Sequence, residues 1–276
     1  MKSIHFCIRR LPVAESFFLW TARVANRYPF ASFSSDPRSA GQGERMKLPQ
    51  PLFQGTLIRR YQRFLADVEL EDGTVVTAHT PNTGSMMGCA CPGNRVLLSK
   101  SASLTRKYPH SWELVQADGV WVGINTQLPN LLAKEAILDG TIAELSGYQQ
   151  IRSEVPYGTR SRIDLLLSGE RGLCYVETKN VTLVKDGVAL FPDAVSERGQ
   201  KHLRELMEMV RQGHRAVNLF IVQRGDGSAL APADAIDPVY GRLLREAAQN
   251  GVELLAYRAE VTRTEVRLER SLPVVL

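Results

Sequence analysis

The sequence predicts an α/β protein with an α+β two-domain arrangement, in which a small β-barrel precedes a mixed α/β domain. Three observations predict it. Residues 53–126 alternate apolar and polar positions between Gly and Asn turns. Residues beyond 130 combine helical spacing with strongly apolar runs. A chain of 276 residues with 44% hydrophobic and 23% charged content suits two domains of modest size. We expect the domains at 46–127 and 128–276.

Residues 1–45 differ from the rest of the chain and are expected to be disordered. They are rich in Arg and Ser, poor in acids, and end in the loop-like SDPRSAGQGER. Two interpretations compete, an organellar-type leader and upstream sequence translated from a misassigned start codon. We favour the second, with Met46 as the start. A secretory signal is disfavoured because VAESFFLWTA is short and interrupted by Glu15.

The overall charge gives no support for a nucleic-acid partner. Residues 1–45 hold Lys2 and six arginines against three acids, so this segment accounts for +4 of the formal net charge of +5 and leaves +1 for residues 46–276. Attraction to phosphate must therefore come from local clusters.

The cysteines and the hydropathy indicate a cytoplasmic protein that does not cross a membrane. Four cysteines are too few and too irregularly spaced for a disulfide framework, which points to a reducing compartment. Cys89 and Cys91 could recruit zinc only with a second ligand pair, and His79 alone does not supply one. No apolar run approaches the roughly 20 residues of a membrane-spanning helix.

The barrel segment carries the residue types that bind single-stranded nucleic acid. Small barrels of about five strands often do so by combining basic side chains with aromatic stacking platforms. An ordinary solvated face is the alternative for each position. The candidates in this segment are Arg59, Arg60, Tyr61, Arg63, Lys107 and His110.

The second domain reads as a mixed sheet with flanking helices. NLLAKEAILDG has helical spacing and closes on Gly140, and three strand-like runs follow it, QIRSEV, SRIDLLL and LCYVETKNVTL. Ser196 then caps a helix that ends before Gly213, and the buried strand AVNLFIVQ comes next. Strand, helix and apolar strand predict a right-handed βαβ unit. A helix from Asp237 and the strand VELLAYR complete the domain.

The stretch SRIDLLLSGERGLCYVETKN carries the candidate catalytic site. A hairpin turn at SGERG sets Asp164 opposite Glu177, with Lys179 two residues on along the same face. A second turn centred on Thr159 sets Glu154 opposite Asp164. Like charges placed so closely must be protonated or neutralised by a cation.

A divalent metal is the natural counter-cation for these carboxylates. Mg²⁺ or Mn²⁺ would be held by Asp164 and Glu177, would activate a water for attack on a phosphodiester, and would work beside Lys179. The alternative is a solvent-facing hairpin on which Lys179 pairs with an acid, an arrangement worth only about 0–1 kcal/mol.

Basic residues near these strands are candidates for phosphate contacts. The helix that begins after Ser196 has free N–H groups at a dipole end that favours anions. Ordinary surface charge, or packing in the case of His202, is the alternative at each position. The candidates are Arg160, Arg162, Arg198, Lys201 and His202.

The Asp164 strand followed by Glu177-Thr178-Lys179 resembles the PD-(D/E)xK nuclease superfamily. More narrowly, residues 47–276 resemble the sugar fermentation stimulation protein A (SfsA) family. The motifs that carry this resemblance are FLADV, PNTGSMMG, RKYPHSWELVQ, INTQLPN, KEAIL, ELSGY, SEVPYG, SRIDLLL, FPDAVSERGQKHLREL and SLPVVL.

The resemblance implies an OB-type barrel, a nuclease-like second domain, non-specific DNA binding, and a bacterial regulatory role in maltose and other sugar metabolism. It places metal ligands at Asp164 and Glu177 and the catalytic lysine at Lys179. The superfamily's additional acid is Glu154 or, alternatively, Glu135. Ile163 stands where the superfamily label has proline. Two hypotheses follow, a metal-dependent nuclease and a non-catalytic DNA-binding regulator with the same fold.

Overall fold

The computed structural model describes residues 46–158 and 161–276, which belong to one compact unit. The N-terminal extension expected at 1–45, the turn residue Thr159 and the candidate Arg160 lie outside the described residues. None of the helices in the described part of the chain has the length and apolar character that a membrane crossing requires.

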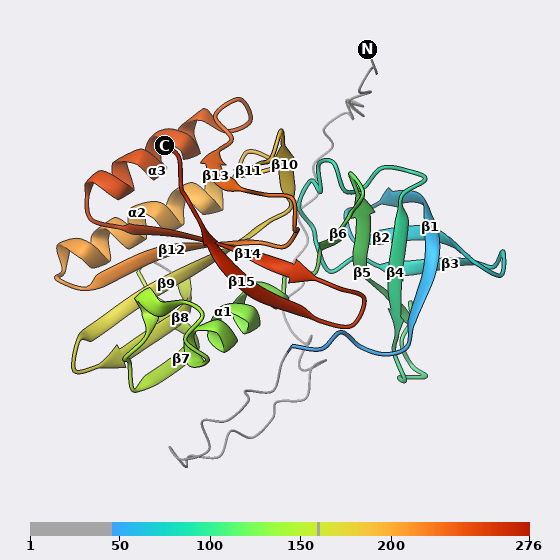
Figure 1. Ribbon diagram of the computed structural model, residues 1–276, viewed down its shortest axis with the longest axis horizontal. Helices are drawn as coiled ribbons and strands as arrows, with labels where there is room; N and C mark the ends of the chain where they lie inside the picture. The colour runs from blue at the N-terminus through green and yellow to red at the C-terminus, as the bar shows by residue number, and fades with distance from the viewer. Residues whose placement is uncertain (1–45, 159–160) are drawn as a thin grey trace. The chain divides into compact units, whose positions relative to one another are not determined.

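The first domain is a closed β-barrel, as the alternating sequence predicted (Figure 1). Its sheet runs in the order β3-β2-β1-β4-β5-β6, and a further pairing of β3 with β5 closes the barrel. Apolar side chains of alternate positions, Trp112 among them, fill its core. The strands are β1 (Leu52–Tyr61), β2 (Leu65–Leu70), β3 (Val75–His79), β4 (Arg95–Lys100), β5 (His110–Ala117) and β6 (Val120–Gly123).

The second domain is built on a mixed six-stranded sheet in the order β15-β14-β12-β9-β8-β7. Strands β7, β8 and β9 form an antiparallel meander, whereas β12 is parallel to both β9 and β14. The predicted βαβ unit is therefore β9, α2 and β12. The strands are β7 (Gln150–Tyr157), β8 (Ser161–Gly169), β9 (Gly172–Val181), β12 (Arg215–Val222), β14 (Glu253–Val261) and β15 (Val266–Leu272).

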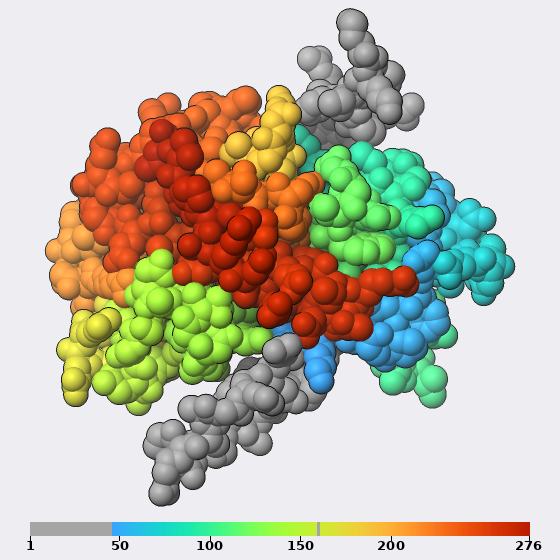
Figure 2. All heavy atoms as spheres, in the orientation of Figure 1, coloured from blue at the N-terminus to red at the C-terminus, as the bar shows by residue number. Residues whose placement is uncertain are grey.

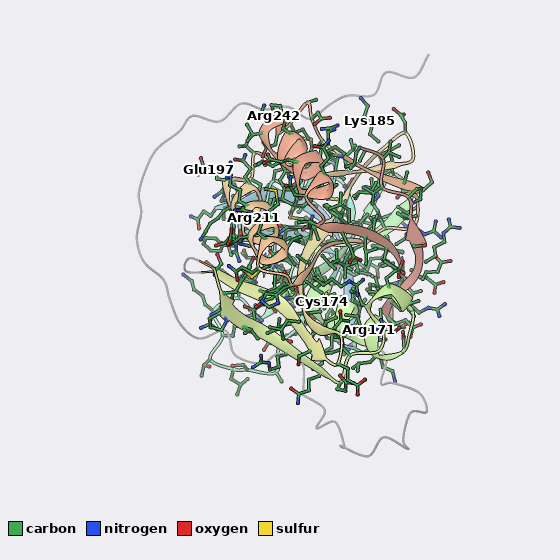
Figure 3. The ribbon with its side chains drawn as sticks, turned by 90° about the vertical axis from the view of Figure 1, so that its left-hand side faces the viewer. Arg171, Cys174, Lys185, Glu197, Arg211 and Arg242 are labelled. Atoms are coloured by element: carbon green, nitrogen blue, oxygen red, sulfur yellow. The ribbon has the colours of Figure 1, made fainter. Side chains whose placement is uncertain are left out.

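Three α-helices accompany this sheet: α1 (Leu128–Leu138), α2 (Glu197–Arg211) and α3 (Pro238–Gln249); a short 3₁₀ helix, η1 (Ala143–Leu145), follows α1. Ser196 caps α2 by accepting a hydrogen bond from Gly199 N, and Asp237 caps α3 through Tyr240 N. Figure 1 shows α2 and α3 side by side, and both pack into one core with β12. Glu197 and Arg211, labelled in Figure 3, lie at opposite ends of α2 and complement its dipole.

The sequence did not predict the small sheet β10-β11-β13, whose strands are β10 (Leu183–Lys185), β11 (Val188–Phe191) and β13 (Ala229–Pro232). Strands of three or four residues are too short to show a period of two. The edge strand β15 was also missed. Figure 2 shows it at the surface with the C-terminal residues. Its buried apolar residues Val266, Leu268 and Leu272 do not keep an unbroken period of two, and a register shift interrupts the pairing of this strand with β14.

Hydrogen bonds link the barrel to the second domain. Gly123 N at the end of β6 donates to Gln223 O. The fully buried Arg224 donates to Thr182 O on one side and to Asp118, in the β5–β6 turn, on the other. We propose a boundary near residue 127, between β6 and α1, with an interface that holds the two domains in one arrangement.

Gly55 offers a test of the barrel. A Cβ atom added there would lie 2.5 Å from Val68 Cγ1 and 2.6 Å from the backbone oxygen of Glu69. Strand β2 is paired on both sides, with β1 and β3, so its backbone cannot move away from the added methyl group. We therefore expect Gly55→Ala to destabilise the protein by about 1–3 kcal/mol. Gly225→Ala is the matched control, since a Cβ there meets nothing within 4 Å. Thermal unfolding measured by circular dichroism should show a lower Tm only for Gly55→Ala.

Candidate metal and catalytic site

A cavity of about 540 Å³ lies where β8 and β9 approach α1 and α2. Its walls are mostly polar and come from both domains. The carboxylates of Glu154, Asp164 and Glu177 line it together with Lys179. The sequence-predicted acids and lysine are therefore brought into one cavity. Its other lining residues include Asn82, Thr83, Gly84, Asn130, Thr178, Asp193, Arg198, Gly199 and His202.

The strands β8 and β9 part at this cavity. The predicted register holds from Gly169↔Gly172 to Leu165↔Val176, and the pairing ends there. The predicted register thus leads to Asp164 and Glu177, which stand at the first position beyond the ladder. There, Asp164 Oδ2 accepts the backbone N–H of Thr178 at 2.8 Å. The Asp164 side chain thus occupies the opening between the strands.

Asn130, near the start of α1, holds two of the acids. Its Nδ2 donates to Asp164 Oδ1 at 3.0 Å and to Glu154 Oε1 at 3.3 Å. Thr178 Oγ1 shares its one proton between Asn130 Oδ1 and Asp164 Oδ2. Glu154 itself has a left-handed φ of 56°, which costs energy for a residue that is not glycine. Backbone strain of this kind is common at functional sites, and here it accompanies a side chain that lines the cavity.

Glu177 is held from the other side by Lys179 and α2. Lys179 Nζ donates to Glu177 Oε1 at 2.7 Å, and His202 Nδ1 donates to the same oxygen. Arg198 Nε donates to His202 Nε2 at 3.4 Å, which makes Nδ1 the protonated ring nitrogen. One oxygen of Glu177 is fixed by two donors, while Oε2 is buried and has no hydrogen-bond partner.

The electrostatics of the acids differ. Burial raises the pKa of the Asp164 carboxyl, and the negative charge of Glu177 raises it further. Partial burial of its carboxyl and the charge of Asp164 raise the pKa of Glu154. Burial alone would raise the pKa of Glu177, but Lys179 and His202 together lower it. The site therefore concentrates negative charge at Glu177 and opposes ionisation of the carboxylate beside it.

This donor set fits a hard divalent cation. Glu177 Oε2 offers a buried oxygen without a donor, and a cation beside Asp164 would relieve the repulsion that raises its pKa. Within residues 46–158 and 161–276, no three His, Cys, Asp or Glu side chains are grouped closely enough to hold a metal alone. Two carboxylates suit Mg²⁺, which keeps several waters when protein-bound.

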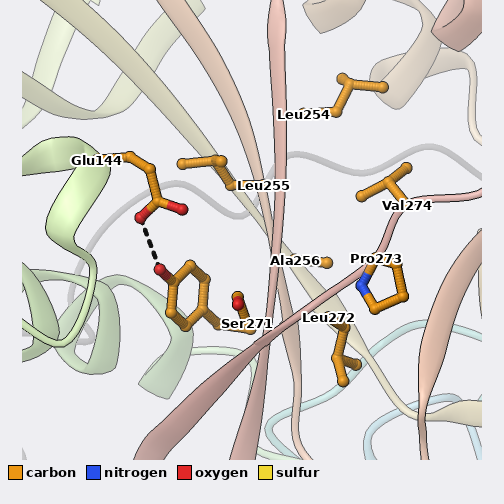
Figure 4. A pocket seen from close by; sticks show the side chains of 9 residues that line it. Glu144, Leu254, Leu255, Ala256, Ser271, Leu272, Pro273 and Val274 are labelled. Atoms are coloured by element: carbon orange, nitrogen blue, oxygen red, sulfur yellow. Dashed lines mark hydrogen bonds between the residues drawn. The ribbon is translucent and has the colours of Figure 1, made fainter.

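A second cavity, of about 400 Å³, lacks this chemistry. It lies along β14 and β15, where Tyr257 Oη donates to Glu144 Oε2 at 2.6 Å (Figure 4). Glu144 is the one acid in its lining, and apolar side chains such as Leu254 and Leu272 make up much of the rest. The acid-lined cavity at β8 and β9 is therefore the candidate site.

Comparison with known proteins places this architecture in a family. The family model described as "Sugar fermentation stimulation protein RE domain" matches residues 127–265, and the model "SfsA N-terminal OB domain" matches residues 58–124. The chain belongs to the SfsA family. The match to the OB model and the closed barrel agree with the predicted fold class.

Relatives in this family are similar over most of the chain. A "Sugar fermentation stimulation protein homolog" of Geobacter sp. (strain M21) is 94% identical over 231 residues, covering 84% of this chain and 100% of the relative. One of Geobacter sulfurreducens is 69% identical over 230 residues, 83% of this chain and 99% of the relative. The solved structure of Pyrococcus furiosus SfsA in complex with Ca²⁺ is 29% identical with a TM-score of 0.76, covering 85% and 100% of the two chains.

The predicted phosphate-binding residues of this SfsA domain divide into exposed and buried groups. Arg162 on β8 and Arg198 and Lys201 on α2 are exposed, and Arg198 lines the cavity. His202 is only 4% exposed and is bonded to Glu177, although it also lines the cavity. Its burial favours the packing alternative, with an added role in orienting Glu177.

The predicted barrel residues divide in the same way. Arg63 and Lys107 are exposed. Arg59 pairs with Asp67 at 2.8 Å and lies over the Tyr61 ring, whose hydroxyl donates to the same Asp67. His110 is buried against Phe53, and Arg60 points its guanidinium at backbone carbonyls. The burial of His110 and the carbonyl partners of Arg60 leave these two side chains less available to nucleic acid than Arg63 and Lys107, and their predicted contacts stay predictions.

Sequence reasoning gave no role to Asn130, although the INTQLPN motif contains it. An amide at the first turn of a helix gives no signal of the strands it will reach. The alternative acid Glu135 lies elsewhere, where its Oε2 accepts the N–H of Met46. Of the two candidates for the additional acid, Glu154 is the one that lines the cavity.

The buried Lys179–Glu177 pair predicts a pH-dependent stability. In Lys179→Met, Glu177 loses its cation and burial raises its pKa, so we expect a loss of about 3 kcal/mol at pH 7. The loss should shrink as the pH falls from the raised pKa of the variant to the lowered pKa of the wild type, because protonated Glu177 needs no counter-charge.

The matched control for this experiment is Lys201→Met. Lys201 is exposed and lies 3.6 Å from Glu205, so its removal should change stability by less than about 0.5 kcal/mol at any pH. Denaturant unfolding at several pH values measures both variants. An equal loss at pH 7 and pH 4 for Lys179→Met would contradict the electrostatic explanation.

Proposed function

We propose that this SfsA-family protein binds DNA with little sequence preference and hydrolyses phosphodiesters with Mg²⁺ or Mn²⁺. The observation that carries the proposal is the convergence of Asp164, Glu177 and Lys179 in one cavity, with a buried Glu177 oxygen that has no donor. The Ca²⁺ named in the P. furiosus SfsA structure supports a divalent cation here.

Asp164 and Glu177 are the residues that would hold the cation. When bound, the cation supplies Lewis acidity and lowers the pKa of a coordinated water. The chain itself supplies orientation and charge. Asn130 and Thr178 fix the Asp164 carboxylate, and the Arg198–His202 pair fixes Glu177 so that Oε2 stays available.

Lys179 supplies positive charge beside the reacting phosphate. Its ammonium group is held at Glu177 Oε1 and is almost fully buried, so its charge acts with little screening by water. In this position it can stabilise the negative charge that develops on the phosphate oxygens during attack. In this proposal Glu154, whose carboxyl pKa is raised, holds or passes a proton at the cavity edge.

The exposed basic and aromatic side chains form the proposed DNA surface. Arg63, Lys107 and the 42% exposed Phe64 lie on the barrel, and Arg162, Arg198 and Lys201 lie near the cavity. Cationic side chains give sequence-independent affinity for phosphate, and an exposed ring can stack on a base. The proposed cytoplasmic location rests on the few, irregularly spaced cysteines. The proposed regulatory role in maltose and other sugar metabolism rests on family membership alone.

A non-catalytic DNA-binding regulator is the second candidate. The observation that favours it is the contact of Lys179 with Glu177, which is also the geometry of a plain buried ion pair. In that case the acids and the lysine stabilise the fold, and the DNA surface alone carries the function.

Cleavage assays separate the two candidates. Wild-type protein incubated with labelled single-stranded and duplex DNA should degrade it with Mg²⁺ or Mn²⁺ and not with EDTA. We expect Lys179→Ala to lower kcat by at least about 100-fold, because a charge that acts in the transition state is lost. Lys185→Ala, on β10 at the periphery of Figure 3, is the control and should leave kcat unchanged.

Metal binding is measured separately by calorimetric titration with Ca²⁺ and Mn²⁺. Asp164→Asn should lose the binding heat, whereas Lys179→Ala should retain it. Wild type that binds metal but cleaves no DNA would support the regulator. The absence of both binding and cleavage would remove the catalytic proposal.

DNA affinity should fall with salt under either candidate function. Each phosphate contact releases counterions, so the logarithm of affinity should decrease linearly with the logarithm of salt concentration, with a slope of about −0.7 to −0.9 per contact. Arg198→Ala should reduce the magnitude of this slope by about one contact. Fluorescence anisotropy at several salt concentrations measures it, and affinity that ignores salt would contradict the proposed surface.

A further inference from the structure

One wall of the acid-lined cavity comes from the barrel. The segment Asn82–Ser85 follows β3, and Asn82, Thr83 and Gly84 line the same cavity as Asp164 and Glu177. Thr83 and Gly84 are exposed, so they are open to a ligand in the cavity. The barrel therefore reaches the groups that carry the proposed chemistry.

Arg60 on β1 donates hydrogen bonds to the backbone of this wall, the segment Asn82–Ser85. Its Nη2 donates to the backbone oxygens of Asn82 and Gly84, both at 2.9 Å, and to Arg63 O at 2.6 Å. Its Nη1 donates to Ser85 O at 3.3 Å. A planar guanidinium with five N–H donors suits several carbonyls at once.

Asp193 holds the wall from the side of the second domain. Its Oδ2 accepts the N–H of Met86 at 2.9 Å, and Ser85 Oγ donates to its backbone oxygen at 2.8 Å. Asp193 lies three residues before Ser196, which caps α2. Helix α2 carries Arg198 and His202, so the hydrogen bonds of Asp193 connect the wall to the segment that leads into the helix that orients Glu177.

A side chain at Gly84 in this wall would lie close to Asn82 and in ordinary contact with Asp193. A Cβ atom on Gly84 would lie 3.0 Å from Asn82 Oδ1 and 3.8 Å from Asp193 Oδ1. Two separate anchors, Arg60 and Asp193, therefore fix the position of exposed backbone at a cavity edge.

We propose that Arg60 is a positioning residue for the substrate strand. It fixes the Asn82–Ser85 wall so that a nucleic-acid strand in the cavity is contacted by the barrel on one side and by the catalytic groups on the other. The proposal rests on the proposed function. Arg60 touches neither the metal site nor the strand, and acts through the backbone it holds.

Steady-state kinetics on single-stranded DNA tests the proposal. Arg60→Met should raise KM by about tenfold and leave kcat within about twofold, because ground-state and transition-state contacts are lost together. A variant that was merely less folded would lower the apparent kcat at constant KM. Arg95→Met is the control, since Arg95 is exposed at the start of β4 and does not line the cavity. Unchanged KM in Arg60→Met would overturn the proposal.

Hydrogen–deuterium exchange gives a readout that needs no activity. In Arg60→Met, peptides covering 82–88 should exchange at least about tenfold faster, and peptides of α2 should be unchanged. Ca²⁺ titration should give the wild-type affinity. If wild type cleaves no DNA, the proposed function fails, and the affinity of Arg60→Met for a single-stranded oligonucleotide in Ca²⁺ then decides. Weaker affinity with faster loop exchange supports positioning, and wild-type values for either overturn it.

Discussion

The repulsion between two neighbouring carboxylates, Glu177 buried and Asp164 half-buried, is the constraint on which this site depends. Burial in their shared cavity opposes the ionisation of both carboxyls, and the charge of Glu177 raises the pKa of Asp164 further. Lys179 and His202 donate to Glu177, and Asn130 and Thr178 supply three donors to Asp164. These hydrogen bonds stabilise part of the negative charge. Glu177 Oε2 has no donor, and a cation bound there would neutralise more of that charge.

The hydrogen bonds to Asp164 require the sheet to open locally. Where β8 and β9 are paired, the N–H groups that face the other strand donate to its carbonyls and are unavailable to side chains. The pairing stops at Leu165↔Val176, and the Thr178 amide turns to Asp164. Two helices then reach the opening, α1 with Asn130 and α2 with His202. The energetic cost of an interrupted ladder is offset by hydrogen bonds that only a carboxylate at this point can accept.

Local patterns predicted much of this arrangement, and long-range contacts account for the rest. The barrel, α2 and the βαβ unit could be predicted because their signals lie in neighbouring residues. These signals are the period-two alternation, the Ser196 cap and the apolar run of β12. The convergence of Asp164, Glu177 and Lys179 follows from hairpin register. Asn130 and the small sheet β10-β11-β13 could not be predicted, because their partners are distant in sequence or their segments too short. His110 and Arg60 show a further limit: residue type suggested DNA contact, but it carried no sign of the burial of His110 or of the backbone carbonyls to which Arg60 donates.

Arg60 and Arg224 show why the barrel and the second domain act as one unit. Arg224 is fully buried with carbonyl and carboxylate partners from both domains, and a buried charge that lost either set would be strongly destabilising. Arg60 bonds to the carbonyls of the wall that Asp193 also holds. The same residue type thus fixes the interface at one place and the cavity edge at another. Because both anchors are directional hydrogen bonds, the cavity keeps its shape only while the two domains keep their arrangement, which ties any chemistry at Glu177 to the barrel.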